Sequence, residues 1–174
     1  DGHPDLATLP GLYFKGWFAL NSWQRFAPDL TKSNWRETIV RTFLQEYEPL
    51  FNANSTKNVL GEPMGKSDWL AKAAGFTTMG PESNQTFVLD QEAFSRTLIS
   101  LLQPLQTVTN ASFFELVHRA FEIAIRGRSN LRDESVGHIF YHIHNPLTLE
   151  EANFLQHYPE ARLLRLTRNP IQSL

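Results

Sequence analysis

The C-terminal part of the sequence contains two β-rich runs separated by a helical pattern, and this order constrains the fold more than any other feature. Residues 136–146, VGHIFYHIHNP, predict a strand that ends at Asn-Pro, and residues 161–170, ARLLRLTRNP, predict a second strand. The helix between them has Thr148 as its expected N-cap, with Glu151 three residues later in a capping box and Pro159 beyond its end. A strand, a helix and a strand in this order predict a βαβ unit, whose two strands are parallel in one sheet. The expected fold class is therefore α/β, a parallel sheet with βαβ units flanked by helices.

Amphipathic helical patterns occupy most of the middle of the chain, and we expect them to pack on each other or to cover one face of the sheet. They span residues 33–51, 67–76, 89–106 and 110–127. N-caps are expected at Ser33 and Ser67 and near Asn110 or Ser112, and Asp90 lies near the start of the third pattern. The aromatic residues of LYFKGWFALNSW, positions 12–23, could line an acceptor pocket, but we expect them to lie in the core. We treat residues 1–174 as a single, incomplete domain.

Size and charge limit the classes of function. The chain has 174 residues, a formal net charge of −2 at pH 7 and a pI of about 6.3, so its overall field favours neither nucleic acid nor an anionic membrane. Any bound anion must therefore be held by a local site. The absence of cysteine excludes disulfides, thiolate metal sites and a cysteine nucleophile.

The sequence shows no targeting or membrane-spanning pattern. No apolar run approaches the roughly 20 residues that span a bilayer, and no signal peptide is visible. The sequence begins without methionine and stops where a helix is starting, which indicates an excerpt from a longer chain. We expect a cytoplasmic protein.

Three histidines fall on one face of the first predicted strand, because positions 138, 142 and 144 have the same parity. His138 and His144 would be about 20 Å apart along an extended strand, so the three cannot share one metal ion. His142 and His144 could form a His-x-His chelate, but the sequence indicates no third ligand, and we expect no metal. His144 lies at the carboxyl end of the strand, where a general base would act, whereas His138 is expected to be structural. The alternative for His144 is a hydrogen-bonded polar residue near a sheet edge.

The second predicted strand ends in Thr-Arg-Asn-Pro, which places Arg168 just before the expected start of a helix at Pro170. A guanidinium group beside the free backbone N–H groups of a helix N-terminus suits a phosphate, because arginine can bind two oxygens at once. The alternative is a surface arginine. The carboxyl ends of neighbouring parallel strands open onto one crevice, so we expect His144 and Arg168 to meet there.

The two strand ends together resemble the core of the sulfotransferases that use 3′-phosphoadenosine 5′-phosphosulfate (PAPS) as donor. In that family one strand carries a basic residue, one intervening position and then the catalytic histidine, with a proline nearby. After a short helix, a second strand ends in Arg-Asn or Arg-Asp and opens the helix that binds the 3′-phosphate of the donor. The resemblance covers residues 136–174, and residues 1–11, DGHPDLATLPG, also resemble the segment that follows the family's phosphosulfate loop.

The resemblance implies a role for each matching residue. His144 falls at the catalytic base, His142 at the basic position before it, and Arg168 at the arginine that binds the 3′-phosphate. Ser173 is the candidate for a second 3′-phosphate ligand, although the family places its serine slightly further from the arginine.

The N-terminal block differs from the family in two ways. The phosphosulfate loop would lie upstream of Asp1, so this excerpt alone is expected to be inactive. Some relatives use a glutamate in the loop after His-Pro-Asp, whereas Pro10 and Gly11 occupy those positions here, which favours His144 as the base.

The activity that the resemblance implies is transfer of a sulfuryl group from PAPS to a hydroxyl or amine of a small molecule or polymer, with no metal, nucleic acid or membrane span. Cationic groups would stabilise the transferring oxygens. Two alternatives stay open. A P-loop kinase-like nucleotide-binding enzyme would need an acidic magnesium ligand at a strand end, which neither HNP nor TRNP supplies. A non-enzymatic helical binding module would use its grooves for a protein partner.

Overall fold

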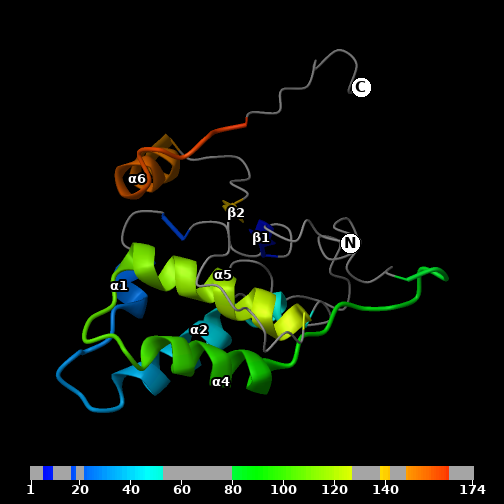
Figure 1. The fold of residues 1–174 in the computed structure, drawn as a ribbon, viewed down its shortest axis with the longest axis horizontal. Coiled ribbons are helices and arrows are strands. Elements are labelled where there is room, and N and C mark those ends of the chain that lie inside the picture. The colour runs from blue at the N-terminus through cyan, green and yellow to red at the C-terminus, as the bar shows by residue number, and fades with distance from the viewer. Residues whose placement is uncertain are drawn as a thin grey trace.

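The computed structural model describes residues 6–9, 17–18, 22–52, 80–126, 138–141 and 148–164. Helices account for most of this part of the chain (Figure 1). They are α1 (Ser22–Phe26), α2 (Trp35–Glu46), α4 (Gln91–Leu102), α5 (Asn110–Arg126), α6 (Thr148–His157) and the 3-10 helix η1 (Glu48–Leu50). The described strands are β1 (Leu6–Thr8) and β2 (His138–Phe140), which pair in parallel.

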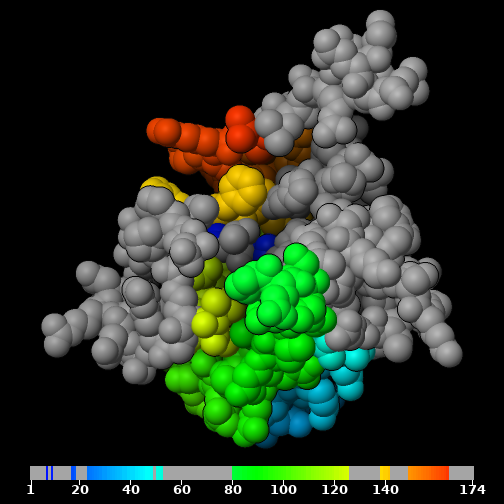
Figure 2. Space-filling view, turned by 90° about the vertical axis from the view of Figure 1, so that its right-hand side faces the viewer, coloured from blue at the N-terminus to red at the C-terminus, as the bar shows by residue number. Residues whose placement is uncertain are grey.

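The strand pair lies between a layer of helices and α6 (Figure 1). In the helical layer, α1 packs on α2, α2 on α4, and α4 on α5, while β1 packs against α5. The space-filling view shows the same order, because the yellow atoms of residues 138–141 lie between the orange atoms of α6 and the yellow-green atoms of α5 (Figure 2). The chain directly before the histidine segment therefore lies between α5 and α6.

The expected parallel sheet with βαβ units is wrong. Each described strand has three residues, and β2 pairs with β1 from the other end of the chain, with Leu6 opposite His138. The second β-rich run is described only at residues 161–164, where it forms no strand and Leu164 is 78% exposed. A continuous apolar run is stable as a strand when other elements cover both faces of its sheet. The exposure of Leu164 means that no element covers residues 161–164 in this way. The described chain is therefore helix-rich, with one minimal parallel pair.

The predictions of helices agree with the structure better than the predictions of strands. The helices predicted at 33–51, 89–106 and 110–127 are confirmed as α2, α4 and α5, and the one at 67–76 lies outside the described residues. Asp90, which lies near the start of the predicted helix, is the N-cap of α4, because its Oδ1 accepts hydrogen bonds from the backbone N–H groups of Glu92 and Ala93 at 2.9 and 3.0 Å.

The caps of α5 and α2 differ from prediction by one residue. Thr109 Oγ1 accepts a hydrogen bond from the backbone N–H of Ser112 at 3.2 Å, and Ser112 Oγ accepts one from the backbone N–H of Thr109 at 2.9 Å. This reciprocal pair is a capping box with Thr109, the neighbour of Asn110, as the cap and Ser112 as the second member of the box. The N-cap of α2 is Asn34 rather than Ser33.

Aromatic rings fill the space between the helices. Trp17 is fully buried, and its ring centre lies 5.8 Å from that of Phe113 and 6.2 Å from that of Phe43. Phe43 lies in turn 6.0 Å from Phe94. Ring pairs at such distances stabilise the core beyond the burial of their apolar area. The prediction that the aromatic residues of 12–23 lie in the core is confirmed for Trp17 and Phe18.

Arg36 joins the start of α2 to the end of α4. Its guanidinium group donates hydrogen bonds to the backbone oxygens of Leu102, Gln103 and Leu105 at 3.0, 3.4 and 2.5 Å. Leu102 is the last residue of α4, Gln103 is its C-cap and Leu105 lies just beyond, where carbonyl groups receive no hydrogen bonds from within the helix. The guanidinium carbon also lies 4.4 Å from the centre of the Trp35 ring. One cation therefore satisfies the end of α4 and fixes it against α2.

Arg36→Lys is expected to lower the free energy of unfolding by about 1–2 kcal/mol, because an ammonium group cannot reproduce the planar donor fork. Arg36→Ala, which removes every donor, should lower it by about 3 kcal/mol. Urea denaturation followed by circular dichroism measures both losses. Arg96→Ala is the matched control, because Arg96 forms an exposed ion pair with Glu92 and such pairs contribute about 0.3–0.5 kcal/mol. Equal losses in Arg36→Ala and Arg96→Ala would contradict this role of Arg36.

Candidate functional site

The four residues predicted to form the site, His142, His144, Arg168 and Ser173, lie outside the described residues. Their roles, and the predicted approach of His144 to Arg168 across one crevice, therefore stay predictions. The structure does describe the chain on both sides of the histidine segment, with residues 138–141 before it and α6 after it. These flanking elements are the described parts of the chain that adjoin the histidine segment in sequence.

The strand pair sets the direction in which the chain enters the histidine segment. β1 and β2 are parallel, so their carboxyl ends lie at the same edge. Burial alternates along β2, since Ile139 packs against the core while His138 and Phe140 are exposed. Ala7, the partner of Ile139 on β1, is fully buried. His138, which we expected to be structural, lies on the exposed face of the strand.

Tyr141, the residue directly before His142, is anchored to the first turn of α6. Its hydroxyl group donates a hydrogen bond to Glu150 Oε1 at 2.9 Å, and Glu150 is only 4% exposed. The backbone N–H of Trp17 also hydrogen bonds to this hydroxyl. Burial raises the pKa of Tyr141 and the nearby Glu150 carboxyl raises it further, so the hydroxyl keeps its proton and acts as a donor.

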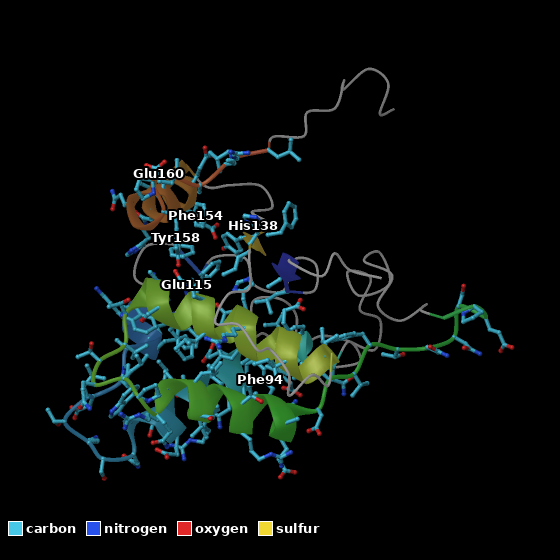
Figure 3. All side chains as sticks on the ribbon, in the orientation of Figure 1. Phe94, Glu115, His138, Phe154, Tyr158 and Glu160 are labelled. Carbon is cyan, nitrogen blue, oxygen red and sulfur yellow. The ribbon has the colours of Figure 1, made fainter. Side chains whose placement is uncertain are left out.

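α6 is held in place by two further hydrogen bonds and by an aromatic face. Asn153 Nδ2 donates to the backbone oxygen of Phe18 at 2.9 Å, and the hydroxyl of Tyr158 donates to the backbone oxygen of Ala111 at 3.1 Å. Phe154 on α6 and Tyr158 directly after it project toward α5 (Figure 3), and the ring centre of Phe154 lies 5.3 Å from that of Phe18. Burial raises the pKa of Tyr158. The helix that follows the histidine segment is thus fixed on the core.

Glu150 is a buried polar residue that the sequence pattern did not mark, because the capping-box pattern pointed to Glu151 beside it. The spacing of Glu150, Asn153 and Phe154 was the available signal, since residues at i, i+3 and i+4 share one helix face. α6 begins at Thr148, so Thr148 is its first helical residue, and the predicted N-cap differs from the structure by one residue.

His118 is a second polar residue inside the core that no motif marks. It is 1% exposed on α5, where its Nδ1 donates to the backbone oxygen of Phe114 at 2.8 Å. Its ring centre lies 4.3 Å from that of Phe114. Burial lowers the pKa of His118 from its usual 6.5 to about 4, although the hydrogen bond to Phe114 acts in the opposite direction. A neutral histidine enclosed by the core has a structural role.

Acid is expected to destabilise the fold through His118. Because the pKa is about 4 in the folded state and about 6.5 in the unfolded chain, the unfolded chain binds the proton first as the pH falls. The contribution of neutral His118 to stability is therefore complete above a pH of about 6.5. Between that pH and about pH 4 it is lost by about 1.4 kcal/mol per pH unit, roughly 3 kcal/mol in all. Urea denaturation at a series of pH values measures this loss.

His118→Gln is expected to remove this part of the pH dependence, because glutamine can still donate to the Phe114 carbonyl but does not titrate. His157→Gln is the matched control, since His157 is an exposed histidine in the last turn of α6. A loss of stability between about pH 6.5 and 4 that survives in His118→Gln would contradict the assignment.

The described residues contain no group of three or more His, Cys, Asp or Glu side chains that could hold a metal ion. Within the same part of the chain, no helix has the length and apolar character needed to cross a membrane.

Comparison of the chain with models of known protein families, with curated protein sequences and with solved structures finds no match. The assignment of a protein class therefore depends on the motifs of the chain and on the geometry around them.

Proposed function

We propose that this chain is part of a PAPS-dependent sulfotransferase that transfers a sulfuryl group to a hydroxyl or amine. His144 is the general base, His142 is the basic residue beside it, and Arg168 binds the 3′-phosphate of the donor, with Ser173 as a candidate second ligand. A cytoplasmic location is part of the same proposal. The part of the proposal that concerns His142 and His144 is supported by β2, which leads into them. The part that concerns Arg168 rests on the Thr-Arg-Asn-Pro motif alone, because residues 161–164, the described part of its predicted strand, form no strand.

The parallel pairing of β1 with β2 is the observation that supports this proposal most directly. β1 follows the His-Pro-Asp sequence of residues 3–5, and β2 leads into the His-Ile-His sequence of residues 142–144. Thr8 is paired with Phe140, so the chain leaves both strands from neighbouring points at one edge. In the sulfotransferases that the sequence resembles, the loop after His-Pro-Asp and the histidine segment serve the same reaction. Adjacent strand ends are the arrangement that such a site needs.

The proposed reaction is a single in-line displacement. The oxygen or nitrogen of the acceptor forms a bond to the sulfur of PAPS while the bond from that sulfur to the phosphate oxygen breaks. His144 takes the proton that the acceptor loses, and 3′-phosphoadenosine 5′-phosphate leaves. Charge spreads over the oxygens of the transferring group, so positioning and cationic stabilisation supply most of the rate.

The complete protein is expected to bind 3′-phosphoadenosine 5′-phosphate and to be stabilised by it. At about 100 times its dissociation constant, the nucleotide should add about 2.7 kcal/mol to the free energy of unfolding, which thermal denaturation detects. Arg168→Ala is expected to lose this stabilisation. A shift with ATP and magnesium alone would favour the kinase-like enzyme instead, and no shift with either nucleotide would favour the helical binding module.

His144→Ala is expected to lower sulfuryl transfer by about 10²- to 10⁴-fold, the usual contribution of a general base, while the stabilisation by the nucleotide persists. Transfer from PAPS to a panel of phenols, alcohols and amines provides the measurement. His138→Ala is the matched control, because His138 belongs to the same segment but lies on the exposed face of β2, and it should keep full activity. Unchanged turnover in His144→Ala would remove His144 as the base.

A further inference from the structure

α6 is bound to the rest of the protein in a different way from the helices of the helical layer. α4 buries the side chains of Phe94, Leu98 and Leu102 completely, and α5 also buries an apolar stripe. The described side chains of α6 are those of residues 149–157, and the buried one among them is the acidic residue Glu150. Burial of apolar area is the dominant favourable term in folding, so α6 gains less stability from it than α4 or α5.

Side-chain hydrogen bonds hold α6 against its neighbours. The hydroxyl of Tyr141, the residue after β2, donates to Glu150 Oε1 in the first turn of α6 at 2.9 Å. Asn153 and Tyr158 donate to backbone oxygens outside the helix at 2.9 and 3.1 Å. Hydrogen bonds made by single side chains therefore do for α6 what a buried apolar stripe does for α4.

Half-buried aromatic rings complete the contact between α6 and the core. The ring centre of Phe154 lies 5.3 Å from that of Phe18, and the ring centre of Tyr158 lies 5.8 Å from that of Phe114. Phe18 and Phe114, which we call the ring platform, are both buried, and their ring centres lie 5.0 Å apart. Neither residue of the ring platform belongs to α6, so the platform keeps its own contact when α6 moves away.

We propose that α6 is a strap that opens and closes over the ring platform while the helical layer stays folded. Elements with few buried apolar contacts open locally at a lower free energy than the core does. The hydrogen bond from Tyr141 to Glu150 is the latch of this strap, because a bond to a buried carboxyl group is strong where the local dielectric is low. The inference does not depend on the proposed sulfotransferase function, since each contact in it joins two described residues.

Amide hydrogen exchange under native conditions tests the strap. In the wild-type protein, the amides of residues 152–157 are expected to be at least about 100-fold less protected than those in the middle of α4. Low concentrations of urea should change their exchange little, because a local opening exposes little surface. Tyr141→Phe removes the donor of the latch and keeps the ring. It should lower the protection of the α6 amides by about 10- to 100-fold and leave that of α4 unchanged.

Arg36→Lys is the matched control, because Arg36 joins α2 to the end of α4 and does not contact the strap. It should lower the protection of the α4 amides by about 5- to 30-fold and leave that of the α6 amides unchanged. Tyr158→Phe, which removes a donor at the other end of the strap, should again lower the protection of α6 alone. Equal protection of α6 and α4 in the wild-type protein would overturn the inference, because the two helices would then open together. An equal loss in both helices in Tyr141→Phe or Arg36→Lys would overturn it as well.

Discussion

Two adjacent aromatic residues, Trp17 and Phe18, hold the described parts of the protein together. The ring of Trp17 lies among those of the helical layer, 5.1 Å from Phe26 and 5.8 Å from Phe113. The ring of Phe18 lies 5.3 Å from that of Phe154 on α6. Buried aromatic side chains remove about 150–250 Å² each from water and dominate the energetics of such a core. One peptide unit therefore joins a ring of the helical layer to a ring that contacts α6, and the hydrogen bond from Tyr158 to Ala111 links the same two parts directly.

The same two residues explain how polar groups are accommodated at this junction. The backbone N–H of Trp17 hydrogen bonds to the hydroxyl of Tyr141, and the backbone oxygen of Phe18 accepts a hydrogen bond from Asn153. Backbone groups in a buried irregular segment need partners, and side chains from β2 and α6 supply them. Tyr141 then donates to Glu150, so the carboxyl group is buried together with a donor. Polar contacts therefore select one way in which α6 can sit on an otherwise apolar surface.

Local signals in the sequence predicted the helices better than they predicted the strands or the buried polar groups. The start of α4 depends on such a local signal, because the partners of Asp90 are the backbone N–H groups of the next turn. A strand depends on pairing with segments that are distant in sequence. The β-rich composition of residues 161–170 was therefore not sufficient, and residues 161–164, the part that the structure describes, form no strand. The burial of Glu150 depends on Tyr141 from another element, and glutamate ordinarily indicates exposure. The predicted site residues remain inferences from motifs, because their mutual geometry depends on the same distant contacts.

β1 and β2 come from nearly opposite ends of the described chain, and this separation orders the steps of folding. At about 5–20 residues per second, a ribosome needs on the order of ten seconds to synthesise the chain between β1 and β2. β1 therefore stays unpaired for that time. The contacts among α2, α4 and α5 are closer in sequence, so these helices can assemble within the interval. β2 and α6 then dock onto a helical layer that already exists. In a nascent chain that stops before β2, the edge of β1 is unpaired and can pair with strands of other chains. The protein is therefore most prone to aggregate before β2 has been synthesised.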